Sequence, residues 1–502
     1  MEKREKRMLG TLILKEIHDT IINLRFLIAS LLCLILIPLG MYVTLQDYNQ
    51  RLNDYNSSQQ LYLQRSEGQI NPRFNAEGYR PPSPLSVFAE GLGLFLPNKA
   101  VTSRRGGVHR SRSSIEGIVN ISNNTKPKSP LSVLFGKIDF VFNVGFVLSI
   151  FALIFTFAGI TSEKEQGTLK LIMANPVPRW SILLAKIIGN YVVFIIPFLI
   201  SFLISIIILN LSGIFPMADS GILSAIIMIL AVTVLFLFCM FTFGMLISSS
   251  MQNSITSIIT VLFIWVLFVL VIPKLSPMIA QIIHPVESEE VLTNMIQNTR
   301  ANIEDELVAK EDDLFKSLLE RYGLTMDTFF QADERNKIET EFDESVIGIR
   351  EEYGGRLTDE TIRLQRNHDN EKNIQNNFAL QLSRISPISC YIYIITELAG
   401  TGISEVVNFT RTAERFQEQV TEDVYDQYTY RQYGTGGRYN SGFYKNDSFD
   451  PSKLPVPQIA NYSFLTVSEV IGEEWIDILL LALYSILFFA GSFVKFLRYD
   501  VR

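Results

Sequence analysis

The sequence is poor in charged residues and in cysteine. Only 19% of its 502 residues are charged, whereas 48% are hydrophobic, and the mean hydropathy is +0.23. This composition is too apolar for an ordinary soluble domain, so a lipid bilayer is the first environment to consider. Three cysteines cannot form a framework of disulfide bonds, and two of them, Cys33 and Cys239, lie within apolar runs.

The sequence also lacks the motifs of catalytic and metal-binding sites. Its four histidines, His18, His109, His284 and His368, are scattered without metal-ligand spacing. It contains neither a G-x-S-x-G nucleophile motif nor the G-x-x-x-x-G-K-[ST] loop that cradles the phosphates of ATP. The sequence therefore predicts a protein that is not an enzyme and holds no cofactor or metal of its own. No nucleic-acid partner is expected.

Long apolar runs dominate the rest of the chain. A helix needs about 20 apolar residues to cross a hydrocarbon core about 30 Å thick. The runs lack the polar stripe of a half-buried helix, which makes a large soluble core the weaker interpretation. They cover residues 26–45, 140–160, 182–211, 222–247, 255–272 and 475–497. The sequence predicts an all-α polytopic membrane protein with six transmembrane helices.

Lysine and arginine gather in three of the short segments that flank these runs: at the start, between the second and third runs, and in the tail. Because short cytoplasmic segments are enriched in basic residues, we expect both termini in the cytoplasm and the long segments outside. The expected order is a cytoplasmic start with an interfacial helix (1–25), first span (26–46), outer loop (47–138), second span (139–160), cytoplasmic hinge (161–181), third to fifth spans (182–272), outer helical domain (273–474), sixth span (475–497) and cytoplasmic tail (498–502).

The segments outside the spans carry their own patterns. Apolar residues at helical spacing in 9–24 predict an amphipathic helix in the membrane interface, the alternative being an inward extension of the first span. Leucines and isoleucines spaced by four or seven between residues 292 and 318 predict a solvated helix with an apolar seam. Two further helices are expected around 328–353 and 359–385, separated at Gly354-Gly355.

Two later stretches are harder to assign. Residues 386–400 are apolar but too short to span a bilayer, which favours an interfacial or re-entrant element. Residues 425–444 are rich in tyrosine and glycine. We expect a solvated loop there, in preference to an aromatic surface that stacks on a sugar or peptide.

The hinge between the second and third runs reads SEKEQGTLKLIMANPVPRW. Ser162 and Glu165 have the spacing of a capping box, in which the hydroxyl and the carboxylate each accept a backbone N–H at the start of a helix. Asn175-Pro176 would end that helix after about three turns, and Pro178 would open the next. So short a helix needs a partner surface. An ordinary connector that lies on lipid headgroups remains an alternative at this point.

The string ITSEKEQGTLKLIMANPVPRWSILLAKIIG resembles the intracellular segment of ABC-2-type permeases, the membrane subunits of ABC exporters. SPLSVLFGKIDF, residues 129–140, resembles the branch of this family with enlarged outer loops. The family pattern is an acidic pair, a Gly-Thr, a run of leucines, a proline and a basic residue. These places are held here by Glu163, Glu165, Gly167, Thr168, Leu169, Leu171, Pro176 and Arg179.

The resemblance implies that the hinge is a coupling helix inserted in a cleft of a separate cytoplasmic ATPase, which binds the ATP and Mg²⁺. The residues expected to couple are Ser162, Glu163, Glu165, Gly167, Thr168, Leu169, Leu171, Ile172, Met173, Pro176 and Arg179. Further expected partners are a second permease copy or a paralogous permease, and membrane lipid. The expected location is the cytoplasmic or inner membrane of a bacterium or archaeon.

Three functions follow from these expectations. The first is export of a hydrophobic or amphipathic substrate such as a lipid, peptide, drug or glycan-linked molecule, because the spans contain few charges. The second is a mechanotransmitter, in which the ATPase moves the outer domain to act on an envelope partner and nothing is transported. The third is a membrane-anchored receptor or scaffold without an ATPase.

Overall fold

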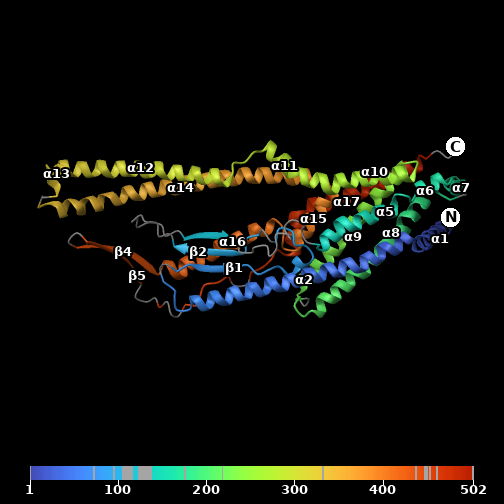
Figure 1. The fold of residues 1–502 in the computed structure, drawn as a ribbon, viewed down its shortest axis with the longest axis horizontal. Coiled ribbons are helices and arrows are strands. Elements are labelled where there is room, and N and C mark those ends of the chain that lie inside the picture. Colours follow the sequence, from blue (N-terminus) through green and yellow to red (C-terminus); the bar gives the residue numbers. More distant parts are fainter. Residues whose placement is uncertain are drawn as a thin grey trace.

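The molecule is elongated, with a helical bundle at one end and two projections at the other (Figure 1). The computed structural model describes residues 2–71, 74–93, 96–104, 117–122, 138–174, 177–216, 219–330, 333–435, 438–445, 450, 454–459 and 462–499. The helices α1 (Glu2–Ile21), α6 (Thr161–Glu165) and α7 (Thr168–Ala174) lie together at the far end of the bundle, near the end of the last helix, α17 (Val467–Leu497).

Six helices of the described residues are long and apolar enough to cross a membrane, as the sequence predicts, and the fold is the expected all-α polytopic membrane architecture. The spans are Phe26–Ser66, Phe140–Glu165, Arg179–Leu211, Ser220–Ser250, Ser254–Ile283 and Val467–Leu497. They contain α2 (Leu24–Ser66), α4 (Phe140–Phe142), η2 (Asn143–Leu148), α5 (Ser149–Thr156), α8 (Arg179–Leu211), α9 (Ser220–Ser250), α10 (Ser254–Val266), η3 (Leu267–Val271), α11 (Ile272–Ile283) and α17. The range of the second span also includes α6, which follows a turn at residues 157–160 and belongs to the hinge described below.

Two of these helices extend well beyond the length that a bilayer requires. At about 1.5 Å per residue, the 43 residues of α2 reach about 64 Å, so residues 47–66, expected in a loop, continue the helix. The fifth span likewise continues through η3 and α11 to Ile283. Helix α2 and the fifth span therefore each reach from the bundle toward one of the projections (Figure 1).

The first projection is a long helical hairpin of α12 (Glu289–Arg321) and α14 (Arg335–Ser383), with α13 (Met326–Phe329) at its tip. The predicted break at Gly354-Gly355 is wrong, because α14 runs through both glycines. Two glycines cost about 2 kcal/mol relative to alanine in a helix, and packing of α14 along α12 outweighs that cost. Arg350 helps to join the two helices through a bidentate ion pair with Glu311, at 2.6 and 2.9 Å.

The second projection, the sheet lobe, is built on an antiparallel sheet that the sequence pattern does not predict. Its strands β1 (Ala76–Tyr79), β2 (Lys99–Arg104) and β3 (Gly117–Ser122) lie in that order, with Ala76 opposite Thr102 and Lys99 opposite Ser122. Helix α16 (Ser404–Val420) packs on the sheet and contributes Phe409 and Phe416 to the lobe's core.

Residues 425–444 do not form the predicted loop. After the π-helical turn η4 (Thr421–Tyr425), strands β4 (Tyr428–Thr435) and β5 (Arg438–Lys445) pair as an antiparallel hairpin, with Tyr428 opposite Lys445. Tyrosine is a strong β-former, and it recurs along both strands. The loop prediction is therefore wrong for these strands.

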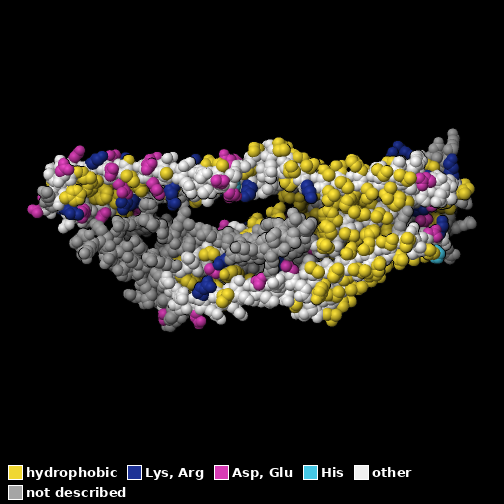
Figure 2. Space-filling view, viewed as in Figure 1, with side chains coloured by type: hydrophobic (Ala, Val, Ile, Leu, Met, Phe, Trp, Pro, Cys, Tyr) yellow, Lys and Arg dark blue, Asp and Glu magenta, His cyan; other side chains and the backbone are white. Residues whose placement is uncertain are grey.

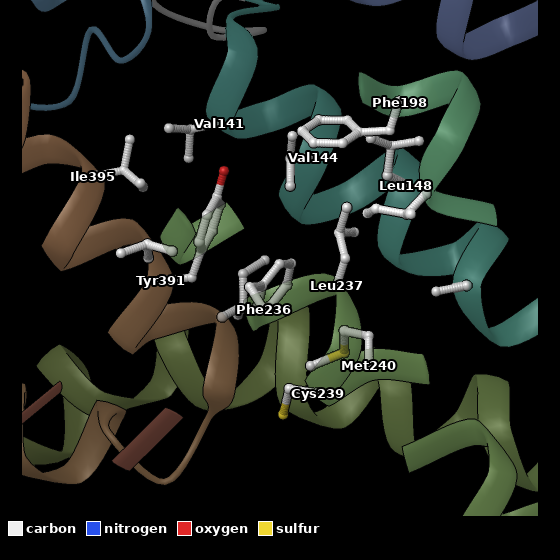
Figure 3. Close-up of a cluster of buried hydrophobic side chains, with 14 of the residues drawn as sticks. Val141, Val144, Leu148, Phe198, Phe236, Leu237, Cys239, Met240, Tyr391 and Ile395 are labelled. Carbon is white, nitrogen blue, oxygen red and sulfur yellow. The ribbon is translucent and has the colours of Figure 1, made fainter. Parts of the chain in front are cut away.

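The short apolar segment 386–400 forms α15 (Pro387–Leu398), which is too short to span a bilayer, as expected. It does not lie on a surface, because it packs between α9 and α17. The ring of Tyr391 stacks on Phe236 of α9 with centroids 4.4 Å apart, inside a cluster that includes Val141 and Ile395 (Figure 3). The interfacial interpretation is therefore wrong, and α15 belongs to the core of the bundle.

Candidate functional site

The hinge between the second and third spans consists of two short helices, α6 and α7, and not of one helix as predicted. The break falls at Gln166-Gly167, where Gly167 has a φ of 72°. Glycine adopts this left-handed conformation without the steric cost that a Cβ would add. The expected stop at Asn175-Pro176 lies outside the described residues, so Pro176 has no placement here. Pro178 precedes α8 at its N-cap.

The predicted capping box is also wrong. Helix α6 begins at Thr161, which places Ser162 inside it, and its N-cap, Ile160, makes no side-chain cap. In the last turn of α9, the Ser248 hydroxyl accepts the backbone N–H groups of Ile160 (3.0 Å) and Thr161 (3.3 Å). The Glu165 carboxylate accepts the backbone N–H of Ser254, the first residue of α10, at 2.8 Å and its hydroxyl at 2.7 Å. Glu165 is thus engaged by a neighbouring helix and not by a local cap.

Basic side chains tie the same segment to the ends of α9 and α17. The Lys164 ammonium donates to the carbonyls of Ser249 (2.6 Å) and Met251 (2.9 Å) and lies 5.2 Å from the ring centre of Tyr499. Arg179, at the start of α8, donates to the carbonyls of Leu497 and Tyr499 at 2.9 and 3.1 Å. These contacts join the hinge to the end of the last span.

A buried lysine joins the hinge to the N-terminal helix. Lys186 of α8 is 3% exposed, and its ammonium lies 2.7 Å from Glu163 of α6 and 3.2 Å from Glu16 of α1. Helix α1, predicted as an amphipathic helix, packs closely along α8: a Cβ on Gly189 would come within 2.9 Å of the Cβ of Glu16. The second oxygen of Glu163, Oε2, is buried and has no hydrogen-bond partner among the described residues.

The expected coupling residues divide into an inward and an outward set. Leu169 is fully buried, and Ile172 and Met173 pack half-buried against the core of the bundle. Leu171, by contrast, is 69% exposed. The remaining described members lie along the hinge: Ser162, Glu163 and Thr168 half-buried, Glu165 exposed, and Gly167 at the break between the helices. The buried side of α7 therefore packs on the chain itself, which gives this short helix a partner surface within the molecule.

Sequence reasoning missed the residues that hold the hinge in place, namely Lys164, Lys186, Glu16, Ser248 and Ser254. One signal was available for Lys186. A lysine within an apolar span marks a functional position, because an unpaired charge there is costly. The partners could not be found from sequence spacing, since Glu16 and Lys186 are far apart in the chain.

No group of three or more histidine, cysteine, aspartate or glutamate side chains in the described part of the chain is arranged to hold a metal ion. The hinge contacts α1, α8, α9, the start of α10 and the end of α17.

With six candidate spans, the fold is that of a multi-pass membrane protein. The family model described as ABC-2 family transporter protein matches residues 11–501, and the chain belongs to this family. None of the curated proteins compared matches it.

Proposed function

We propose that this chain is the permease subunit of an ABC exporter, and that a separate ATPase subunit drives it through α7. The proposal rests on a difference between residues at the hinge: one apolar side chain is exposed, and several charged side chains bind the other helices. Exposed Leu171 presents an apolar side chain at the end of the bundle, while Lys164, Lys186 and Glu165 fix the same segment to the other helices. Force applied to α7 would therefore reach the spans directly.

The sidedness, partners and location belong to the same proposal. The end that carries α1, α6 and α7 faces the cytoplasm, because short basic segments favour that side. ATP and Mg²⁺ are bound by the ATPase, and a second permease copy or a paralogous permease completes the transporter. The membrane is the cytoplasmic or inner membrane of a bacterium or archaeon, with both termini in the cytoplasm.

A hydrophobic or amphipathic substrate fits the interior of the bundle. Lys186 and Asp477 are buried there in ion pairs, and the buried carboxylates of Asp139 and Glu397 accept backbone N–H groups. The core around them is aliphatic and aromatic, as the cluster that contains Phe198 and Phe236 illustrates (Figure 3). This interior favours lipid-like cargo over small ions, which need polar groups along their path.

A mechanotransmitter is the second candidate, supported by the way the hairpin is joined to the bundle. Helix α11 continues the fifth span directly into the hairpin base, where it packs along α14. At the end of α14, Arg384 forms a bidentate ion pair with buried Asp477 of α17, at 2.6 to 3.1 Å. Movement of the spans would therefore also move the hairpin.

Two leucines of α7 provide the test of ATPase coupling. Leu171→Asp should abolish co-purification of the ATPase while leaving the thermal unfolding midpoint of the chain unchanged, because Leu171 is exposed. Leu169→Asp should lower that midpoint, because it places a carboxylate in the core. If the Leu171→Asp variant co-purifies with the ATPase as the wild type does, the proposed contact between Leu171 and the ATPase is refuted. If the wild type recovers no ATPase at all, the receptor or scaffold function is favoured instead.

A shortened hairpin separates export from mechanotransmission. Residues 308–352 can be replaced by a short Gly/Ser turn, because Ile303, Leu307 and Tyr353 pack together and can close the remaining hairpin. ATP-dependent movement of fluorescent lipid or amphipathic peptide is then measured in liposomes that hold the chain with its ATPase. Retained movement supports export. Mechanotransmission is supported if neither the wild type nor the shortened chain moves cargo, and if the shortened chain keeps full ATPase activity but loses its function in cells.

A further inference from the structure

The hydrophobic surface of the bundle does not stop where the bilayer should end. The fifth span, Ser254–Ile283, is 30 residues long and so reaches about 45 Å, whereas the hydrocarbon core is about 30 Å thick. Measured from Ser254, that thickness is used up near Lys274, an exposed charged residue suited to the headgroup region. The rest of α11 therefore stands beyond the hydrocarbon on the side of the hairpin.

This part of α11 is nevertheless apolar and exposed. Met278 is 57% exposed and Ile282 is 80% exposed. Together with their neighbours they form what we call the α11 strip, namely Leu275, Met278, Ile279, Ile282 and Ile283. Figure 2 shows the hydrophobic surface of the bundle continuing along α11 toward the hairpin. Such a strip next to a bilayer is suited to contact with hydrocarbon chains.

The strip leads to a cavity at the elbow between α11 and α12. This elbow groove has a volume of about 540 Å³, within the range of small-molecule sites. Apolar side chains from three segments line it: Val286 of the elbow, Leu292 and Met295 of α12, and Leu364 of α14. The groove exists because the α11–α12 chain turns away here and leaves one face of α14 partly uncovered.

The elbow groove is held open by polar contacts on its walls. The buried ring of His368 on α14 lies with Nε2 3.0 Å from the backbone carbonyl of Glu287. Further along α14, the Gln375 side chain donates to the backbone carbonyl of His284 at 2.6 Å. These contacts fix the elbow to α14, so the groove is formed before any ligand arrives.

Two carboxylates stand at the edge of the groove. Glu287 and Glu371 line it and are exposed, and neither forms an ion pair with another described residue. The surrounding hairpin is also acidic: between residues 287 and 372 acidic side chains outnumber basic ones about two to one. An apolar floor with a negative rim is complementary to a molecule that has a hydrocarbon chain and a positive head.

A second copy of the chain fits this surface less well. A two-fold interface places the same patch of both copies against itself. At the groove it would bring Glu287 and Glu371 of one copy toward the same residues of the other, and like charges oppose such a contact. The continuity of the strip with the lipid-facing surface also indicates an occupant that arrives from the bilayer.

We propose that the elbow groove binds a lipid-type amphiphile with a hydrocarbon chain and a cationic head group, which enters from the adjoining leaflet along the α11 strip. Met295 and Leu364 would contact the chain, and the carboxylates of Glu287 and Glu371 would contact the head. Binding requires neither ATP nor the ATPase, so this proposal stands or falls separately from the transport function.

The test uses the full chain in phosphatidylcholine nanodiscs with two photoreactive probes. One is hexadecylamine and the other hexadecanoic acid, with a diazirine at the same carbon. Labelling of the peptides that hold Met295 and Leu364 is divided by labelling of the peptide that holds Phe263, an exposed residue of α10 in the fifth span, to correct for partitioning. We expect this ratio to be at least about fivefold higher for the amine, since two partly exposed ion pairs supply that discrimination.

Variants assign the labelling to the groove. Glu287→Gln with Glu371→Gln should bring the amine ratio down to that of the acid, whereas Asp312→Asn with Asp313→Asn, exposed carboxylates further along α12, should leave it unchanged. Met295→Asp should reduce labelling by both probes, and Val308→Asp on the same helix should not. Equal labelling by the two probes in the wild type, or amine selectivity that survives in the Glu287/Glu371 variant, would overturn the proposal. So would disulfide cross-linking between copies through Ile282→Cys, because the strip would then be a protein interface.

Discussion

The ammonium of Lys186 lies 2.7 Å from the carboxylate of Glu163, inside the end of the bundle. The pair connects α8 with α6, and Glu16 of α1 joins it from the other side at 3.2 Å. A buried ion pair of this kind adds little net stability, but removing one partner is costly because a charge is left uncompensated. The triad therefore requires the three helices to keep their positions relative to one another.

Replacing Lys186 by methionine should release this constraint. The two carboxylates would then face each other without a cation, and the loss of stability should be about 2–3 kcal/mol, at the low end for buried pairs because both glutamates are partly exposed. Hydrogen exchange should accelerate in α1 and α6 and stay unchanged in α12. Adding Glu16→Gln and Glu163→Gln should restore protection. If the single variant exchanges like the wild type, the triad does not hold α1.

Gly167 should be sensitive to substitution although there is space for a side chain at this position. A Cβ there meets no atom within 4 Å, so any effect of Gly167→Ala comes from its φ of 72°. The left-handed conformation costs an alanine about 1 kcal/mol, which should shift the orientation of α7. We expect weaker stimulation of the ATPase in the reconstituted complex. Gly472→Ala, equally open but within the helix α17, is the control and should not reduce stimulation.

The membrane architecture could be predicted because hydropathy reflects a simple physical requirement. A span must be apolar along its whole length, and all six predicted runs lie within helices that meet this condition. The ends of these helices could not be predicted in the same way. Beyond the bilayer, α2 continues because tertiary contacts support it, and its apolar signal fades before the helix does, whereas α11 stays apolar to its end at Ile283.

The hinge shows why the site was only partly predictable. The spacing of Ser162 and Glu165 favours a local cap, but α6 begins at Thr161 and the Ser162 N–H donates to the carbonyl of Ala158. The Glu165 carboxylate instead accepts from Ser254, which is close in space and distant in the chain. A sequence window cannot contain that competitor. Leu169 and Leu171 likewise look equivalent in the sequence, and only the packing of α7 on the bundle separates a core residue from an exposed one.

The two glycines within α14 offer a stabilising substitution. A Cβ added at Gly354 or at Gly355 would meet no atom within 4 Å, and both residues lie in a continuous helix. Replacing both by alanine should therefore increase the stability of the hairpin by about 1–2 kcal/mol, through the higher helix propensity of alanine. Hydrogen exchange in residues 346–362 should slow by about fivefold to thirtyfold. A loss of protection would mean that α14 bends at these glycines during function.

The sheet lobe should respond to pH through Glu405. This carboxylate is buried at the start of α16, where it accepts the hydroxyl of Tyr462 and lies 3.5 Å from the Arg80 guanidinium. Burial raises the pKa of Glu405 above its usual value of 4.5, although Tyr462 and Arg80 act in the opposite direction. The folded lobe therefore binds this proton more readily than the unfolded chain does.

The sign of the pH effect follows from that difference in pKa. Stability contributed by Glu405 is fully present below its unfolded pKa and is lost as the pH rises through the higher folded pKa. Thermal unfolding midpoints of the wild type and of Glu405→Gln should therefore diverge with pH, the wild type gaining on the variant as the pH falls from neutral toward about 4.5. Glu414→Gln, an exposed carboxyl on the same helix, should show no such trend. A constant difference between wild type and Glu405→Gln would mean that Glu405 keeps its charge in the folded lobe throughout that range.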